Sequence, residues 1–102
     1  MTLHGLGDLY VPFVHEHIYR RRAIANGSDN LLVQRAIRAP GHCDFTVEEQ
    51  SSAFSDLVGW VNAGIKPIGD NVLDASIVSQ ESYGCTFSDP ARDQHMSACL
   101  AQ

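Results

Sequence analysis

Two short loops decide the fold of this chain: LHGLGDLYVP at residues 3–12 and GHCDFT at residues 41–46. Each loop follows a short apolar run, and each leads into a segment with helical periodicity. The first loop contains two glycines and a proline, and Pro40 stands directly before the second, which is typical of turns with special backbone needs. The surrounding sequence is therefore expected to supply strands that end at these loops and helices that begin after them.

The apolar runs beside the loops are typical of strands. Residues 2–4 resemble the end of a strand, and residues 31–37 form a short apolar run between turn residues, as a buried strand does. A helix of about 14 residues between them spans about 21 Å, which matches the length of about 23 Å for a seven-residue strand. Strand, helix and strand then form a βαβ unit with parallel strands and a right-handed crossover. The sequence thus predicts an α/β fold.

Helical periodicity predicts one helix over residues 12–26 and another over residues 46–63. The second helix opens on a capping box, because Thr46 can accept from the N–H of Glu49 while the Glu49 side chain reaches back. Gly64 is the expected stop of this helix. Apolar residues recur at helical spacing on both segments: Val14, Ile18 and Ala25 on the first, and Val47, Phe54, Leu57, Val58 and Val61 on the second.

This topology brings Asp8 and His42 to one edge of the predicted sheet. Asp8 lies four residues past the first strand, His42 follows the second strand, and the two are 34 residues apart, about one βαβ repeat. Parallel strands place their carboxyl ends at one edge, where open α/β sheets form ligand sites. A carboxylate beside an imidazole can fix its tautomer and favour the imidazolium, leaving Nε2 free to act as a base. Asp8 and His42 are therefore the candidate catalytic residues.

The two loops resemble those of α/β-hydrolases, most of all bacterial serine esterases and lipases. In that superfamily a Gly-Asp turn after a strand presents the triad acid, and a Val-Pro pair leads into the next helix, as in residues 3–12. Residues 41–46 resemble the histidine loop GHCxFT, which precedes the last helix. The resemblance implies that Asp8 is the triad acid and His42 the general base of a carboxylic ester hydrolase that uses no cofactor and no metal.

The resemblance extends over residues 2–72. Residues 60–70, WVNAGIKPIGD, are similar to the stretch that follows the last helix in these enzymes, and residues 83–87, YGCTF, add a further likeness. Residues 1–72 are therefore expected to be the C-terminal βαβα portion of an α/β-hydrolase domain. Periodicity fades afterwards, so residues 73–102 are expected to form an irregular tail over the surface.

The nucleophile is the one large departure from the family pattern. Chain order in these enzymes is Ser, then Asp or Glu, then His, so a G-x-S-x-G elbow has to precede Asp8. The sequence contains no such motif. We therefore expect a C-terminal fragment of a serine hydrolase that is inactive alone. The nucleophile, the oxyanion-hole donors and the pocket for a small-molecule ester substrate would then belong to a missing N-terminal half.

Composition argues against several other classes of protein. The 102 residues include 12 acidic and 7 basic side chains, a formal net charge of −5, which argues against nucleic-acid binding. No apolar run approaches the roughly 18 residues of a membrane-spanning helix. The N-terminus also lacks the basic start and apolar core of a signal peptide. Two alternatives stay open: a cytoplasmic chain, or a secreted or periplasmic parent whose true N-terminus is missing.

The three cysteines leave room for a single disulfide. They form no CxxC pair, which argues against a structural zinc site. Cys85 and Cys99 bracket a short polar loop in the tail, whereas Cys43 follows His42 directly. We predict a disulfide between Cys85 and Cys99, with Cys43 free. Such a bond would matter in an exported parent.

Three hypotheses from different classes remain open: a hydrolase fragment, a non-catalytic α/β binding or interaction module, and a small metal-binding protein. An in-frame G-x-S-x-G upstream would favour the first over the second. The third would draw on His4, His15 and His42, which lack the spacing of metal ligands. His4 by itself has two interpretations, a hydrogen-bonded histidine at a strand end, which we favour, or a residue of a substrate pocket.

Overall fold

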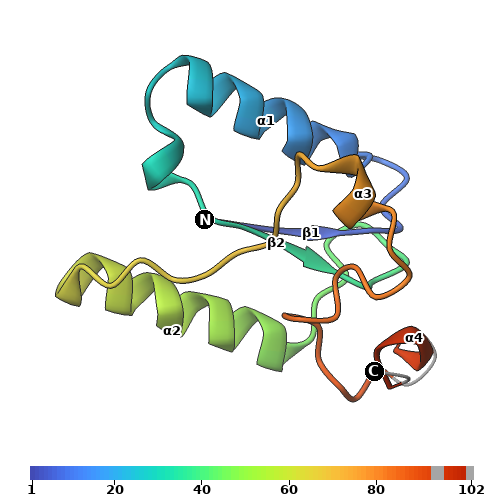
Figure 1. Cartoon of the computed structure of the whole chain (residues 1–102). Coiled ribbons are helices and arrows are strands. Elements are labelled where there is room, and N and C mark those ends of the chain that lie inside the picture. Colours follow the sequence, from blue (N-terminus) through green and yellow to red (C-terminus); the bar gives the residue numbers. More distant parts are fainter. Residues whose placement is uncertain (93–95, 101–102) are drawn as a thin grey trace.

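The computed structural model describes residues 1–92 and 96–100 of the chain. A two-stranded parallel sheet lies at its centre, between two long helices (Figure 1). Across this described part, every helix is too short or too polar to cross a membrane. The elements in chain order are β1 (Thr2–Gly5), α1 (Val14–Ala25), the 3-10 turn η1 (Asp29–Leu31), β2 (Gln34–Ile37), α2 (Val47–Ala63), α3 (Ala75–Val78) and α4 (Ser97–Leu100).

The strands β1 and β2 pair in parallel, with Thr2 opposite Gln34, and this confirms the predicted βαβ unit. The second strand is shorter than the predicted residues 31–37, because it begins only at Gln34. The chain before it forms η1 instead. The guanidinium of Arg20 on α1 donates to main-chain carbonyls at both ends of this turn, at 3.0 and 2.9 Å. These bonds hold the backbone of η1 in a turn, although the apolar pattern of residues 31–33 by itself favours an extended strand.

The two outer edges of the sheet differ. On the β2 side, the carbonyl of Gln34 accepts from the N–H of Asp70, and the Asp70 carboxylate accepts from the N–H of Ala36, both at 2.8 Å. A Cβ on Gly69 would lie 2.8 Å from the Gln34 carbonyl oxygen, so glycine permits this close approach. The outer edge of β1 has no strand beside it in the described part of the chain. The chain therefore closes one edge of its sheet and leaves the other open.

The long helices begin and end close to where the sequence predicts. The capping box of α2 is confirmed: Thr46 Oγ1 accepts from the N–H of Glu49 at 3.2 Å, and Glu49 Oε1 accepts from the N–H of Thr46 at 2.9 Å. Gly64 follows the helix in the left-handed conformation, with φ 70°. This is the conformation that glycine adopts without steric cost at a helix end. The other helix, α1, lies within the predicted residues 12–26.

Both long helices bury small and acidic side chains. The buried residues are Glu16 with Ala23 on α1, and Glu49 with Ala53 on α2. The apolar residues that predicted the helices are mostly exposed, Phe54 to 67%. Each helix therefore contacts the rest of the chain through a narrow face, and its apolar stripe stays on the surface. The exposed stripe residues are Val14 and Ile18 on α1, and Val47, Phe54, Val58 and Val61 on α2.

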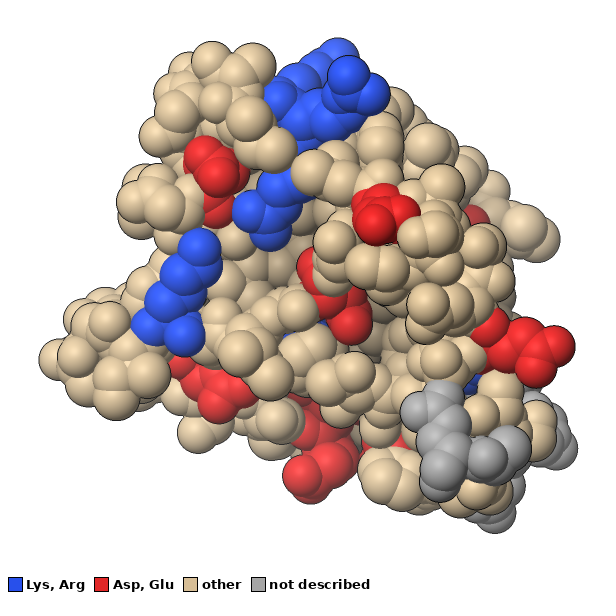
Figure 2. All heavy atoms as spheres, in the orientation of Figure 1, with Lys and Arg blue, Asp and Glu red and all other residues tan. Residues whose placement is uncertain are grey.

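Charges of both signs are interleaved on the face shown in Figure 2. Basic side chains lie in separate groups there, with acidic side chains between and around them. The three consecutive arginines at residues 20–22 do not form one basic patch. Arg21 and Arg22 are exposed, whereas Arg20 turns inward and its Nε donates to the side-chain oxygen of Gln34 at 2.8 Å. One arginine of this run is therefore a structural residue.

The segment after residue 72 joins the core as well as covering the surface. Tyr83 and Met96 are buried, and the Tyr83 hydroxyl donates to the carbonyl of Asn71 at 2.7 Å. Arg92 pairs with Glu49 of α2 at 2.8 Å, which fastens this segment to the helix. Its regular structure in the described residues consists of the one-turn helices α3 and α4. Residues 93–95 and 101–102 of the expected tail lie outside the described residues.

A disulfide joins Cys85 to Cys99, whose Cα atoms are 5.6 Å apart, and Cys43 is free and exposed. Both parts of the cysteine prediction are confirmed. The bond closes a loop with a sequence separation of 14 residues. Since Arg92 lies within this loop, the disulfide also restricts the chain that carries its contact with Glu49.

Replacing both bridged cysteines by serine should lower the free energy of unfolding by about 3 kcal/mol at most, because the unfolded chain regains the entropy of an open loop. Thermal unfolding followed by circular dichroism measures this loss. Reductant added to the wild type should reproduce it, and Cys43→Ser should leave the wild-type transition nearly unchanged. A double variant as stable as the wild type would contradict the prediction.

Candidate active site

We call residues 5–12 the acid loop and residues 38–45 the histidine loop. Asp8 occupies the first turn after β1, and its side chain is only 5% exposed. Its Oδ1 accepts from the N–H groups of Tyr10 and Val11, both at 2.9 Å. A short acidic side chain that bonds the backbone two and three residues ahead is typical of a tight turn. This turn fixes the carboxylate so that Oδ2 faces the neighbouring loop.

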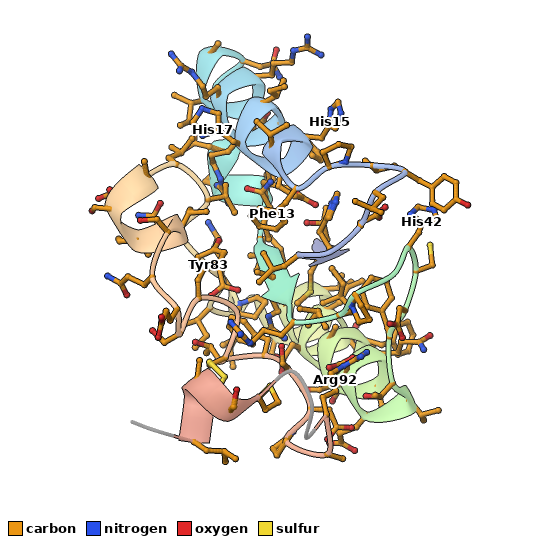
Figure 3. The ribbon with its side chains drawn as sticks, turned by 90° about the vertical axis from the view of Figure 1, so that its right-hand side faces the viewer. Phe13, His15, His17, His42, Tyr83 and Arg92 are labelled. Carbon is orange, nitrogen blue, oxygen red and sulfur yellow. A yellow bond between two sulfur atoms is a disulfide. The ribbon has the colours of Figure 1, made fainter. Side chains whose placement is uncertain are left out.

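His42 lies in the histidine loop and contacts Asp8 directly. Its Nδ1 is 2.6 Å from Oδ2 of Asp8, across 34 residues of sequence. The ring is 43% exposed, and Figure 3 shows it at the rim of the molecule, apart from His17 and Tyr83. Because a carboxylate accepts, the proton of the neutral ring belongs on Nδ1, and Nε2 carries the lone pair. The structure thus brings the two predicted residues together with Nε2 left for another group.

The protonation state of Asp8 suits this contact. Burial by itself raises the pKa of the carboxyl, but the N–H of Val11, the His42 ring and the N–H of Tyr10 together outweigh burial. The net result is a pKa below the ordinary value of 3.8. Asp8 is therefore ionised at neutral pH and accepts hydrogen bonds through both oxygens.

The acid loop and the histidine loop are in main-chain contact, which extends the sheet pairing beyond the strands. The N–H groups of Leu6 and Gly7 donate to the carbonyls of Ile37 and Ala39, at 2.8 and 2.9 Å. A Cβ on Gly7 would lie 2.8 Å from main-chain atoms of Pro40, closer than real Cβ atoms come. Glycine at this position is therefore what lets the two loops approach closely enough for the carboxylate to reach the imidazole.

Two features stand out around His42: a strained backbone at the next residue, and exposed apolar side chains on the acid loop. Cys43 has φ 52°, and among the described residues it is the sole non-glycine with positive φ. Such conformations cluster at functional sites, where the rest of the structure holds them in place. The Tyr10 ring lies 5.6 Å from the His42 ring, and Leu9 and Tyr10 are 91% and 86% exposed. An exposed apolar surface thus stands beside the candidate base.

The sequence predicted a hydrogen-bonded His4 but not the chain of polar side chains that it joins behind the acid loop, in which Glu16 and Gln34 are buried. His4 places Nε2 2.6 Å from the carbonyl oxygen of Val11 and Nδ1 3.2 Å from Oε1 of Glu16. Glu16 Oε2 accepts from the Gln34 amide at 2.5 Å, and Gln34 accepts from Arg20. The favoured interpretation of His4 as a hydrogen-bonded strand histidine agrees with these contacts. The sequence offered one signal for these contacts: Glu16 lies within the first predicted helix, and Gln34 within the predicted buried strand.

The remaining histidines of the described chain lie on α1 and point in different directions. His15 is exposed, and Nδ1 of His17 is 3.2 Å from the carbonyl of Val72, as their separation in Figure 3 reflects. Within residues 1–92 and 96–100, no group of three or more His, Cys, Asp or Glu side chains could hold a metal ion. The geometry of the described residues therefore offers no set of ligands for the metal-binding hypothesis.

Comparison with known proteins gives a weak similarity to a hydrolase. Over 67 residues the chain is 28% identical to an o-phthalyl amidase of Xanthobacter agilis. The match covers 66% of this chain, and the chain spans about 15% of the length of that relative. No protein-family model matches the chain, and no solved structure matches it. The chain is thus a small α/β unit with partial similarity to a protein that has a hydrolase name.

Acid should break the contact between Asp8 and His42 only below the ordinary carboxyl range. Because the fold lowers the pKa of Asp8 below 3.8, its stabilising contribution is fully present above that pH and is lost as the pH falls through the folded value. The carboxyl ¹³C resonance of Asp8 should report this midpoint. In His42→Ala the midpoint should rise toward 3.8, because the ring is lost. A wild-type midpoint at or above 3.8 would contradict the prediction.

Gly7→Ala should separate the two loops. The added Cβ meets the Pro40 backbone at 2.8 Å, so relief requires main-chain movement, at a cost of about 1–3 kcal/mol. Chemical denaturation measures the loss, and the Asp8 ¹³C titration measures whether the contact with His42 survives. The matched control is Gly59→Ala in α2, where a Cβ meets nothing within 4 Å and stability should rise slightly. Equal effects of the two substitutions would refute the close approach.

Proposed function

We propose that this chain is the acid-and-base part of a serine hydrolase: the C-terminal βαβα portion of an α/β-hydrolase fold, acting on carboxylic esters. The distance of 2.6 Å between Nδ1 of His42 and Oδ2 of Asp8, at the carboxyl end of a parallel sheet, carries the proposal. This contact holds the ring proton on Nδ1 and leaves Nε2 as a base. The similarity to an o-phthalyl amidase supports the coarser assignment, a hydrolase.

In the proposed reaction His42 moves protons while Asp8 keeps its charge. Nε2 takes the proton of a serine hydroxyl as the serine oxygen attacks the ester carbonyl, and the Asp8 carboxylate stabilises the imidazolium that results. The same N–H then protonates the leaving alkoxide as its bond to the carbonyl carbon breaks, and an acyl-enzyme remains. Water, which gives its proton to Nε2, then attacks the acyl-enzyme, and the protonated ring returns that proton to the serine oxygen as the carboxylic acid product leaves. The lowered pKa of Asp8 is consistent with a carboxylate that stays ionised throughout.

The nucleophile in this proposal comes from outside the chain, because the sequence has no G-x-S-x-G elbow. The open edge of β1 supports a place for the missing part. A groove of about 600 Å³ is lined by residues of β1 and of α2. We infer that an upstream part of a hydrolase domain adds a strand to β1 and covers this groove. The groove is lined by Met1, Thr2, Leu3, Phe45, Gln50, Ser51, Ala53, Phe54 and Leu57.

In the proposed assembly, residues 1–72 belong to the hydrolase domain and residues 73–102 form its C-terminal segment. The ester substrate is what the resemblance of the two loops implies. The relative's name adds amides to the substrates worth testing, since an amide carbonyl needs the same general base. The competing assignment, a non-catalytic interaction module, is favoured by one feature, the exposed apolar surface of Leu9 and Tyr10. It requires no chemistry at His42.

The chain alone should hydrolyse no ester above background, because it holds a base without a nucleophile. Fusing or mixing it with an upstream hydrolase segment that carries G-x-S-x-G should restore turnover. In that assembly His42→Ala should lower kcat by several orders of magnitude, and Asp8→Asn by about 10⁴-fold, since an amide favours the wrong ring tautomer. Release of p-nitrophenol from short-chain esters, and of aniline from matched anilides, measures both substrate classes.

The control in these assays is His15→Ala, which removes an exposed histidine of α1 and should leave kcat unchanged. Activity of the lone chain that survives His42→Ala would exclude the proposed role of His42. An assembly that forms a stable complex yet hydrolyses neither substrate class, with His42→Ala binding its partner normally, would favour the interaction module.

A further inference from the structure

We infer that His4 is a positioning residue for the site: held by Glu16, it fixes the turn of the acid loop that aims Asp8 at His42. The inference rests on the proposed function for its catalytic meaning, but its geometry involves this chain alone. His4 is on β1, one residue before the loop begins, and its ring is only 11% exposed. Its contacts place it between α1 and the acid loop.

The link from His4 to Asp8 runs through Val11. The N–H of Val11 donates to Oδ1 of Asp8 at 2.9 Å, while its carbonyl oxygen lies 2.6 Å from Nε2 of His4. Both main-chain groups of Val11 thus have a partner: the N–H bonds the Asp8 carboxylate, and the carbonyl bonds His4. Nε2 of His4 is also 4.0 Å from Oδ2 of Asp8, the oxygen that faces His42. Displacing the ring would release the backbone that orients the carboxylate.

The protons at His4 are determined by its partners. A carbonyl oxygen can only accept, so Nε2 of His4 carries a hydrogen. Nδ1 faces Oε1 of Glu16 at 3.2 Å, and a hydrogen bond between these two atoms uses one proton, on either the ring or the carboxyl. In both states the ring is held at its two nitrogens. The donor to Val11 is therefore present whichever partner holds the shared proton.

Glu16 is itself held from the far side. Gln34 donates its amide to Oε2 of Glu16 at 2.5 Å and to the Glu16 carbonyl at 2.8 Å, and its own oxygen accepts from Arg20 at 2.8 Å. Since both ends of the Gln34 amide are used, the amide has one orientation. The His4 and Phe13 rings also form a T-shaped pair, with centroids 5.4 Å apart at 89°. Rotating the ring would take a partner from the Glu16 carboxylate, whose side chain is only 7% exposed, and the loss of a partner is costly for a buried polar group.

The competing interpretation is that these contacts stabilise the fold and do nothing for the site. The two interpretations differ in what happens at His42. If His4 only stabilises the fold, a folded variant at position 4 keeps the ring proton of His42 on Nδ1. If His4 positions the acid loop, replacing it lets the Asp8 carboxylate turn away from His42. The proton of His42 then moves to Nε2, although His42 touches no altered atom.

The test uses the full chain with ¹⁵N-labelled histidine and reads the ring tautomer of His42 at alkaline pH. The wild type should show His42 as the Nδ1–H tautomer. His4→Phe keeps the ring shape but has no donor, and it should convert His42 mainly to Nε2–H. His4→Gln can still donate to the Val11 carbonyl and should restore Nδ1–H. Val33→Ala removes buried core packing away from the loop and should leave the tautomer unchanged.

A folded His4→Phe whose His42 remains Nδ1–H would overturn the inference. Should that variant fail to fold, the wild type provides a second test. A scalar coupling across the hydrogen bond between Nε2 of His4 and the carbonyl carbon of Val11 is expected, and its absence would equally overturn the proposal. These spectra do not depend on turnover, so they separate this inference from the proposed function. In a restored enzyme, His4→Phe should lower kcat by up to about 100-fold with KM nearly unchanged.

Discussion

The main-chain contact between the acid loop and the histidine loop is the constraint on which the candidate site depends. Parallel pairing of β1 with β2 starts it, and bonds from the N–H groups of Leu6 and Gly7 carry the same pairing past the strand ends. Side chains on loops from adjacent parallel strands reach each other only if the loops stay this close. The absence of a Cβ at Gly7 allows it, so the carboxylate and the imidazole meet across 34 residues of sequence.

Local signals in the sequence predicted the features that depend on neighbouring residues. The capping box of Thr46 and Glu49, the stop at Gly64 and the βαβ order need only spacing and backbone preference, and the structure has all three. The meeting of Asp8 and His42 followed from topology, because parallel strands end at one edge. Their chemical roles as acid and base remain a proposal that rests on this geometry and on the resemblance of the two loops.

The buried polar contacts could not be predicted in the same way. Periodicity assigns apolar residues to the inner face of a helix, yet α1 and α2 each bury a glutamate. A buried carboxylate is stable only with partners, and those of Glu49 include Arg92, 43 residues away. Burial raises the pKa of Glu49, but Arg92 and two main-chain N–H groups lower it more, so the net pKa lies below its usual value. Such pairing has no local signature in the sequence.

The side chains that hold the site and those that line the incompletely covered surface are different residues. Asp8, His42 and the polar chain behind them are held by residues of β1, α1, β2 and their loops, which bond one another within this chain. The incompletely covered groove is lined instead by residues 1–3, by Phe45 of the histidine loop and by residues of α2, and none of these bonds the Asp8 carboxylate. In the proposed hydrolase, pre-organisation of the acid and the base is thus separable from delivery of the nucleophile. A proposed partner would pair with the open sheet edge and cover the apolar helix face. It would then meet a His42 ring whose proton Asp8 already holds on Nδ1.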